Sequence, residues 1–142
     1  MNSDDEIYPM PMFDRLEVSD VTQSTEWYRD VLGFGIIFQM PGLTHLRYRK
    51  YADILLVPSE AEIDPDGQGR GVDIYFTVES ETVADIAERA KQADTIVEGP
   101  SETAHNTREV VIADPDGYTL VFTEPVDPTR TFEDVTGVEF EP

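Results

Sequence analysis

Apolar and polar positions in the first part of the chain predict a strand, a helix and three further strands. Met12–Val18 alternates between polar and apolar side chains, which is the period of a strand. Asp20 is placed to cap a helix that runs to Gly33, because Gln23 follows it at the spacing of a capping box. Three more strands are predicted between turn residues, at Phe34–Met40, Leu43–Lys50 and Asp53–Val57.

The same pattern starts again beyond the acidic, proline- and glycine-rich segment Pro58–Gly71. Val72–Val78 alternates as a strand, and Ser80 is the predicted cap of a helix that ends near Ala93. Three short strands follow, at Thr95–Glu98, Arg108–Ala113 and Tyr118–Thr123, with the turn Asp114–Gly117 before the last of them. We interpret the Asp and Gly residues of that turn as turn formers, since both are favoured there for backbone reasons.

The two halves therefore carry one pattern twice. A shift of 60 residues places Leu16 on Phe76 and Val18 on Val78. This predicts an α+β fold of two tandem βαβββ modules, which form a cupped, incompletely closed mixed sheet barrel with the helices outside. The predicted boundaries are an N-terminal arm at 1–11, modules at 12–58 and 71–125 joined by a linker at 59–70, and an acidic C-terminal tail at 126–142. The two modules are expected to form one domain.

Charge and composition limit the partners and the cellular location that we expect for this chain. The 142 residues include 30 acidic and 10 basic ones, which gives a net charge of −20 and a pI of about 4.1. Such a surface repels phosphate backbones and anionic lipids, so we expect neither a nucleic acid nor a membrane as partner. Because the acidic residues are spread along the chain, we interpret them as a halophilic adaptation to molar salt; an acidic protein from an ordinary organism is the alternative.

Cysteine chemistry, secretion and membrane insertion are not expected, because the sequence lacks the features that each requires. There is no cysteine, so disulfides and thiolate catalysis are excluded. No signal peptide and no apolar span of transmembrane length is present, so the expected location is the cytoplasm.

Two motifs resemble one known superfamily. VSDVTQSTEWYRDVLGF (Val18–Phe34) is similar to the first strand end and helix of the vicinal oxygen chelate proteins, and ADPDGYTLVFTEP (Ala113–Pro125) is similar to their closing turn and strand. This superfamily includes glyoxalase I, extradiol dioxygenases, fosfomycin-resistance proteins and bleomycin resistance proteins. The resemblance covers roughly residues 12–125 and implies the duplicated βαβββ fold. It does not fix the function, because the superfamily includes isomerases, lyases, dioxygenases, transferases and pure binding proteins.

The resemblance also implies four positions at which catalytic members hold a divalent metal. In this chain these positions correspond to Phe13, Leu55, Asp73 and Val121. Three of them are apolar and offer no nitrogen or oxygen ligand, so we expect no metal and no other cofactor. The alternative is an atypical site for a divalent metal such as Ni, Mn, Fe or Zn, with His45 and His105 as the first residues to test.

A cup without a metal is expected to be a pocket for a small organic molecule. Strand alternation predicts a lining of aromatic, apolar, charged and hydroxyl side chains, namely Phe13, Arg15, Glu17, Leu55, Asp73, Tyr75, Thr77, Thr119, Val121 and Thr123. Whether His45, Arg47 and Arg49 reach the pocket stays open, and no catalytic residue is assigned.

The sequence thus predicts a small-molecule-binding protein like the glyoxalase and bleomycin resistance proteins, and the resemblance implies a homodimer. One alternative is a metal-dependent lyase, isomerase or dioxygenase with an atypical site. Others are a metal-free acid–base catalyst that uses Glu17, Asp73 or Tyr75, and a structural module whose own side chains fill the cup.

Overall fold

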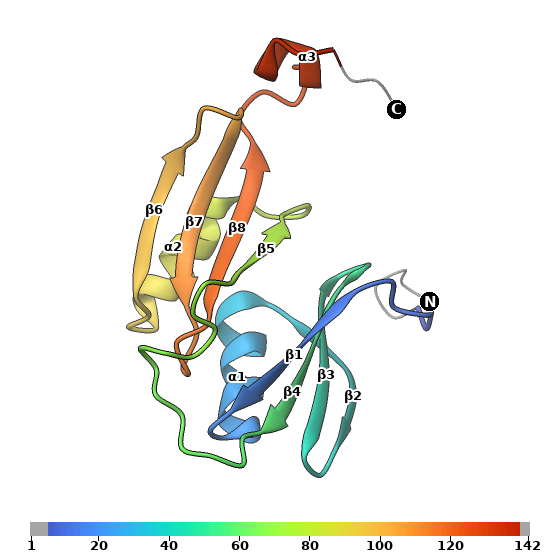
Figure 1. The fold of residues 1–142 in the computed structure, drawn as a ribbon, viewed down its shortest axis with the longest axis vertical. Helices are drawn as coiled ribbons and strands as arrows, with labels where there is room; N and C mark the ends of the chain where they lie inside the picture. Colours follow the sequence, from blue (N-terminus) through green and yellow to red (C-terminus); the bar gives the residue numbers. More distant parts are fainter. Residues whose placement is uncertain (1–5, 140–142) are drawn as a thin grey trace. The chain divides into compact units, whose positions relative to one another are not determined.

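Strand, helix and three strands follow one another twice along the chain (Figure 1). The computed structural model describes residues 6–139. The first module consists of β1 (Phe13–Val18), α1 (Val21–Leu32), β2 (Gly35–Met40), β3 (Leu43–Arg49) and β4 (Ala52–Pro58). The second consists of β5 (Asp73–Thr77), α2 (Val83–Gln92), β6 (Val97–Glu102), β7 (Thr107–Ala113) and β8 (Thr119–Pro125), and a short helix α3 (Phe132–Thr136) follows. The predicted α+β class of two tandem βαβββ modules with open, mixed sheets is confirmed.

The first module is a four-stranded sheet with α1 on one face. Its strand order is β1-β4-β3-β2, with β1 parallel to β4 and the other neighbours antiparallel. Thr25 on α1 donates a hydrogen bond to the Thr44 hydroxyl on β3 at 3.1 Å, which identifies the face of the sheet that α1 covers. Tyr28 and Leu32 of α1 are completely buried, so the core of the module lies between the helix and this face of the sheet.

The ends of α1 lie where the sequence predicts them. The Asp20 carboxylate accepts a hydrogen bond from the backbone N–H of Gln23 at 3.0 Å. Gly33 ends the helix in the left-handed conformation, with φ at 78°, and its N–H bonds the last turn. Local chemistry alone therefore defines this helix.

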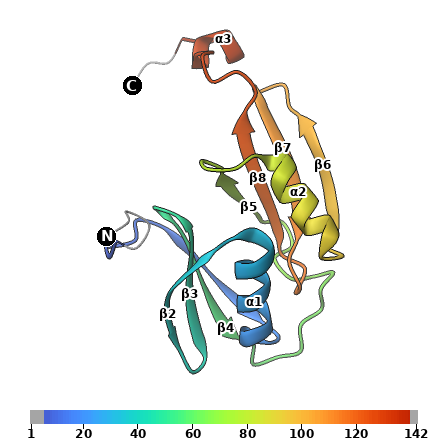
Figure 2. The same ribbon diagram turned by 180° about the vertical axis from the view of Figure 1, so that it is seen from behind.

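The second module repeats the topology of the first. Its strand order is β5-β8-β7-β6, with β5 parallel to β8, and α2 lies against one face (Figure 2). Phe76 and Phe122 stack at 5.2 Å between their ring centroids and are buried. The predicted cap Ser80 is wrong: α2 begins after Thr82, because the side chains of Thr82 and Asp85 each accept a hydrogen bond from the other's backbone N–H in a capping box.

Strand alternation divides the side chains of each sheet between its two faces. Leu16, Ile54 and Leu56 are buried on the α1 side of the first sheet. We use "helix-free face" for the opposite face of each sheet. In the first module it receives the odd-numbered residues of β1 and β4 together with His45 and Arg47, and in the second module the odd-numbered residues of β5 and β8.

The chain divides into two compact units. One comprises the described residues up to Val72 together with the turn segment Ala113–Tyr118, and the other comprises Asp73–Ile112 and the described residues from Thr119 onward. The turn segment thus packs with the first module, although it connects two strands of the second.

Hydrogen bonds explain why the turn segment packs with the first module. The Asp114 carboxylate accepts a 2.7 Å bond from the Tyr28 hydroxyl and bonds of 2.9 Å from the backbone N–H groups of Asp116 and Tyr118. Burial raises the pKa of Asp114, and the hydrogen bonds that it accepts offset this only in part. Asp114 and Asp116 are both buried. They therefore join the turn to the first module and do more than form the turn.

Hydrogen bonds to Asn106 hold the start of the C-terminal tail, which then forms α3. The Val126 N–H donates to the Asn106 carbonyl at 2.9 Å, and the Asn106 side chain donates to the Asp127 carbonyl at 2.7 Å. Thr131 and Asp134 form the capping box that opens α3.

No helix in residues 6–139 is long and apolar enough to cross a membrane.

Candidate functional site

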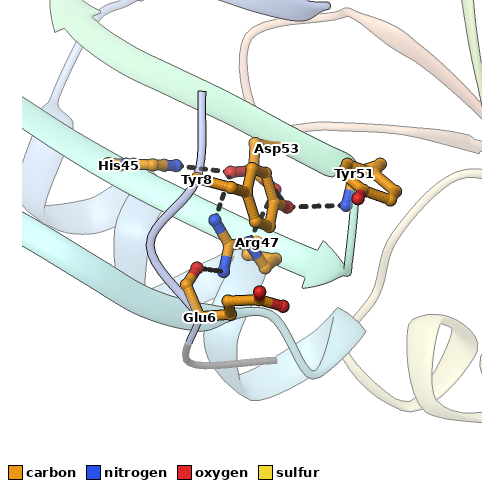
Figure 3. Close-up of polar contacts among 6 residues, drawn as sticks. All are labelled: Glu6, Tyr8, His45, Arg47, Tyr51 and Asp53. Atoms are coloured by element: carbon orange, nitrogen blue, oxygen red, sulfur yellow. Dashed lines mark hydrogen bonds and ion pairs between the residues drawn. The ribbon is translucent and has the colours of Figure 1, made fainter. Parts of the chain in front are cut away.

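A group of charged and aromatic side chains lies on the helix-free face of the first sheet (Figure 3). We call Tyr8, His45, Arg47 and Asp53 the polar cluster; Glu6 and Tyr51 border it. Strands β3 and β4 bring its centre together, because their antiparallel register sets Arg47 opposite Asp53 and His45 opposite Leu55. Opposed and diagonal neighbours on one sheet face lie within reach of each other's side chains.

Asp53 is the acceptor at the centre of the cluster. Arg47 donates two hydrogen bonds to it, from Nε to Oδ1 at 2.8 Å and from Nη2 to Oδ2 at 2.9 Å. His45 Nε2 lies 2.7 Å from Oδ2. Arg47 is 3% exposed and Asp53 4%, whereas the His45 side chain keeps 14% of its surface. The bidentate geometry satisfies both buried charges, and His45 is the member of the trio that reaches the surface.

The end of the N-terminal arm covers Arg47. The guanidinium carbon of Arg47 lies 4.3 Å from the centroid of the Tyr8 ring, and its Nη1 donates to the Glu6 carbonyl at 2.7 Å. The Tyr8 hydroxyl donates to Asp53 Oδ1 at 3.3 Å and accepts from the Tyr51 N–H at 2.6 Å. The arm thereby completes the hydrogen bonding of the cluster and separates Arg47 from solvent.

Asp53 is ionised at neutral pH despite its burial. Desolvation raises the pKa of this carboxyl, but the hydrogen bonds and charges of Arg47 and His45 outweigh it, so that the pKa lies below the ordinary value of 3.8. An ionised carboxylate has no proton to donate. The hydrogen in the bond between His45 and Asp53 therefore belongs to His45 Nε2.

Four of the predicted pocket residues lie on the same face as the polar cluster. The parallel register of β1 and β4 sets Phe13 beside Asp53 and Arg15 beside Leu55. Phe13 is 43% exposed, and Arg15 forms an exposed ion pair of 3.7 Å with Glu17 on its own strand. The face thus combines apolar contact area with charged groups that are already paired.

The other six predicted pocket residues lie on the helix-free face of the second sheet. They occupy three pairs of β5 and β8 positions, Asp73 with Thr119, Tyr75 with Val121, and Thr77 with Thr123. Thr123 Oγ1 is buried and has no hydrogen-bond partner in the part of the chain that the structure describes. Buried polar atoms normally have a hydrogen-bond partner, so this hydroxyl has a hydrogen bond still to be made.

The residues at the four implied metal positions do not fit a divalent metal. Phe13, Leu55 and Val121 present only carbon atoms, and Asp73 is a single carboxylate. Within residues 6–139, no three or more His, Cys, Asp or Glu side chains gather as they would around a metal ion. His45 is bonded to Asp53, and His105 lies in the exposed loop between β6 and β7.

Sequence reasoning missed Asp53 and Tyr8. For Asp53 the signal is incomplete. Equal spacing about the predicted Lys50–Ala52 corner would set Asp53 opposite Arg49, but a register shift between Arg47 and Arg49 sets it opposite Arg47. The hairpin can therefore be predicted from the sequence, but this pairing cannot. For Tyr8 there is no such signal, because an arm without periodicity does not indicate where it packs.

Comparison with known proteins identifies the family to which this chain belongs. The model of the Glyoxalase/Bleomycin resistance protein/Dioxygenase superfamily matches residues 13–122, from the start of β1 into β8. The chain belongs to this superfamily. The resemblance predicted from the two motifs is confirmed, and the match spans both modules of the superfamily fold. A search of curated proteins found no match.

Solved structures share the fold at low sequence identity. The fosfomycin resistance protein FosX from Listeria monocytogenes, complexed with Mn(II) and sulfate, is 14% identical, with a TM-score of 0.68 over 92% of this chain and 98% of that chain. TnmS3, an antibiotic binding protein from Streptomyces sp. CB03234, is 20% identical, with a TM-score of 0.63 over 80% and 93%. The virulence protein STM3117 from Salmonella typhimurium is 24% identical, with a TM-score of 0.62 over 85% and 100%. These similarities establish the fold alone.

Proposed function

We propose that this chain binds a small organic molecule without a divalent metal, on the helix-free sheet face that carries the polar cluster. The observation behind the proposal is the composition of that face. Phe13 is exposed there beside Asp53, whose charge Arg47 already neutralises. An apolar surface with a few fixed polar groups is typical of small-molecule sites.

The residues at the implied metal positions support a site without a metal. Phe13 and Leu55 supply contact area where catalytic relatives would need metal ligands. Both oxygens of Asp53 are bonded to Arg47, so this carboxylate is not available as a ligand in their place. With a lining of this kind, we expect the side chains to contact the ligand directly, with no metal ion between them.

Drug-like molecules are the first ligands to test, because TnmS3 is an antibiotic binding protein and FosX a fosfomycin resistance protein. Thermal unfolding in molar KCl with EDTA, against a panel that includes bleomycin and fosfomycin, is expected to identify a compound that raises the Tm. Calorimetric titration of that compound then gives its Kd with and without EDTA. Equal values are expected, and binding that EDTA abolishes would contradict the proposal.

A pair of variants places the ligand on the proposed face. Phe13→Ala is expected to weaken binding about tenfold, since it removes an exposed aromatic contact. Ile96→Ala is the matched control, because Ile96 is an exposed apolar residue that belongs to no strand or helix, and binding should be unchanged. Equal losses in both variants would place the ligand elsewhere.

A second copy of the chain is the protein partner that we propose, since the superfamily resemblance implies a homodimer. Sedimentation equilibrium in molar KCl is expected to give twice the chain mass of 16.0 kDa. The mass of a single chain at all concentrations would refute this part of the proposal.

A further inference from the structure

We infer that His45 presents the unprotonated Nδ1 of a neutral imidazole as a hydrogen-bond acceptor, and that it recognises an aromatic ligand carrying a hydroxyl or amine N–H donor. This inference rests on the proposed function and states the chemistry of the ligand. It follows from three features of the first module, taken in turn: the partner of His45, the accessibility of its second ring nitrogen, and the side chains on either side of it.

The partner of His45 fixes its tautomer. Both oxygens of Asp53 accept hydrogen bonds from Arg47, and Oδ2 lies 2.7 Å from His45 Nε2. A carboxylate held in this way is an acceptor only, so Nε2 must carry a hydrogen. A neutral imidazole has one N–H, and Nδ1 is therefore left with a lone pair.

The second ring nitrogen is open to a ligand. The one hydrogen bond of the His45 ring within residues 6–139 is that to Asp53. Nε2 lies toward the buried carboxylate of Asp53, and the His45 side chain keeps 14% of its surface exposed. We place Nδ1 on that exposed edge of the ring, as an acceptor whose hydrogen bond is still to be made.

Apolar side chains stand on both sides of this acceptor. The sheet register sets Phe38 of β2 opposite His45 on one side and Leu55 of β4 opposite it on the other. Phe38 is 54% exposed, so its ring is available for contact with a second aromatic ring. A ligand that is an aromatic ring with an O–H or N–H substituent satisfies both the ring of Phe38 and the lone pair of Nδ1. An ether or carboxylate would set a second lone pair against Nδ1.

The first test needs no ligand. In the His105→Gln variant, His45 is the only histidine, so its two ring nitrogens are the only imidazole signals in a ¹⁵N-labelled sample. In alkaline buffer, long-range ¹H–¹⁵N correlation is expected to show the tautomer with hydrogen on Nε2. A hydrogen on Nδ1 would overturn the inference and leave the proposed function standing.

The second test uses phenol as the probe and anisole, which lacks the O–H, as its control. Phenol is expected to shift the Nδ1 resonance and to bind about threefold to tenfold more tightly than anisole, the range of one net hydrogen bond. In His45→Leu that preference should disappear; if this variant does not fold, the comparison in the protein with His45 still decides. Equal shifts from the two probes, or no shift from phenol, would refute the acceptor role. A chain that shows the expected tautomer but binds no compound of the panel would instead contradict the proposed function.

Discussion

Neutralising Asp53 tests how the polar cluster stabilises the first module. In Asp53→Asn, the guanidinium of Arg47 stays buried but loses its counter-charge and the charge-assisted character of two hydrogen bonds. Breaking a buried ion pair by removing one partner costs roughly 3–5 kcal/mol. That is a large part of the roughly 5–15 kcal/mol by which most domains are stable. We therefore expect the free energy of unfolding to fall by about 3–5 kcal/mol.

Urea unfolding followed by fluorescence gives this free energy for the module that contains the cluster. Trp27, the only tryptophan, lies on α1 with its ring 4.9 Å from that of Tyr28. The signal therefore reports on the first module, and the change in free energy is obtained from the shift of the midpoint at constant slope.

Two further variants separate the loss of the ion pair from a general loss of packing. Arg47→Met with Asp53→Leu removes both charges and is expected to restore most of the stability, because no buried charge is left unpaired. Arg15→Met breaks the exposed pair with Glu17 and should cost less than about 1 kcal/mol. A cost of less than about 1 kcal/mol for Asp53→Asn, or equal losses in the single and double variants, would refute a stabilising role of the buried ion pair.

Three other changes have expected outcomes. Gly117→Ala should destabilise the chain by at least about 1–3 kcal/mol, since Gly117 has φ at 96° and a Cβ there would collide with the Pro65 backbone; Gly71→Ala, at φ 83° with open space around it, should cost less in the same urea titration. The pKa of Asp53 is lowered, so its contribution to stability is complete above pH 3.8 and is lost as the pH falls through the pKa of the folded state. Burial raises the pKa of Asp114, whose contribution has the opposite sign and is lost as the pH rises. On acidification from pH 7 to about pH 3, the destabilisation by Asp53→Asn should therefore shrink and that by Asp114→Asn should grow; parallel changes would contradict the assignments. Finally, a net charge of −20 predicts that the Tm rises with KCl up to molar concentrations, and a flat curve would argue against a halophilic protein.

The fold could be predicted because its elements are defined by local chemistry. Asp20 and Gly33 are the start and end signals of α1, and both act as predicted. The difference at α2 is also local, because Thr82 is followed at the spacing of a capping box by Asp85, whereas Val83 stands three residues after Ser80. Signals within a few residues of one another are therefore sufficient to place the helices.

The polar cluster and the buried turn could be predicted only in part, because tertiary packing decides them. The hairpin of β3 and β4 can be read from the sequence, but the register shift between Arg47 and Arg49, which sets Arg47 opposite Asp53, cannot. The packing of Tyr8 over Arg47 joins segments with no periodic relation to each other. Asp114 is a second contact of this kind. The sequence predicts its place in the turn, but it does not predict the hydrogen bond that the distant Tyr28 hydroxyl donates to it.

Metal content is the measurement that we would make first, because the proposed binding of an organic ligand without a metal would set this chain apart from catalytic members of its superfamily. The protein is purified in molar KCl without chelator, and its Ni, Mn, Fe, Co and Zn are measured per chain. We expect values near zero, which persist after each metal is added and excess ion removed. One divalent ion per chain would contradict it and would mean that residues other than Phe13, Leu55, Asp73 and Val121 supply the ligands.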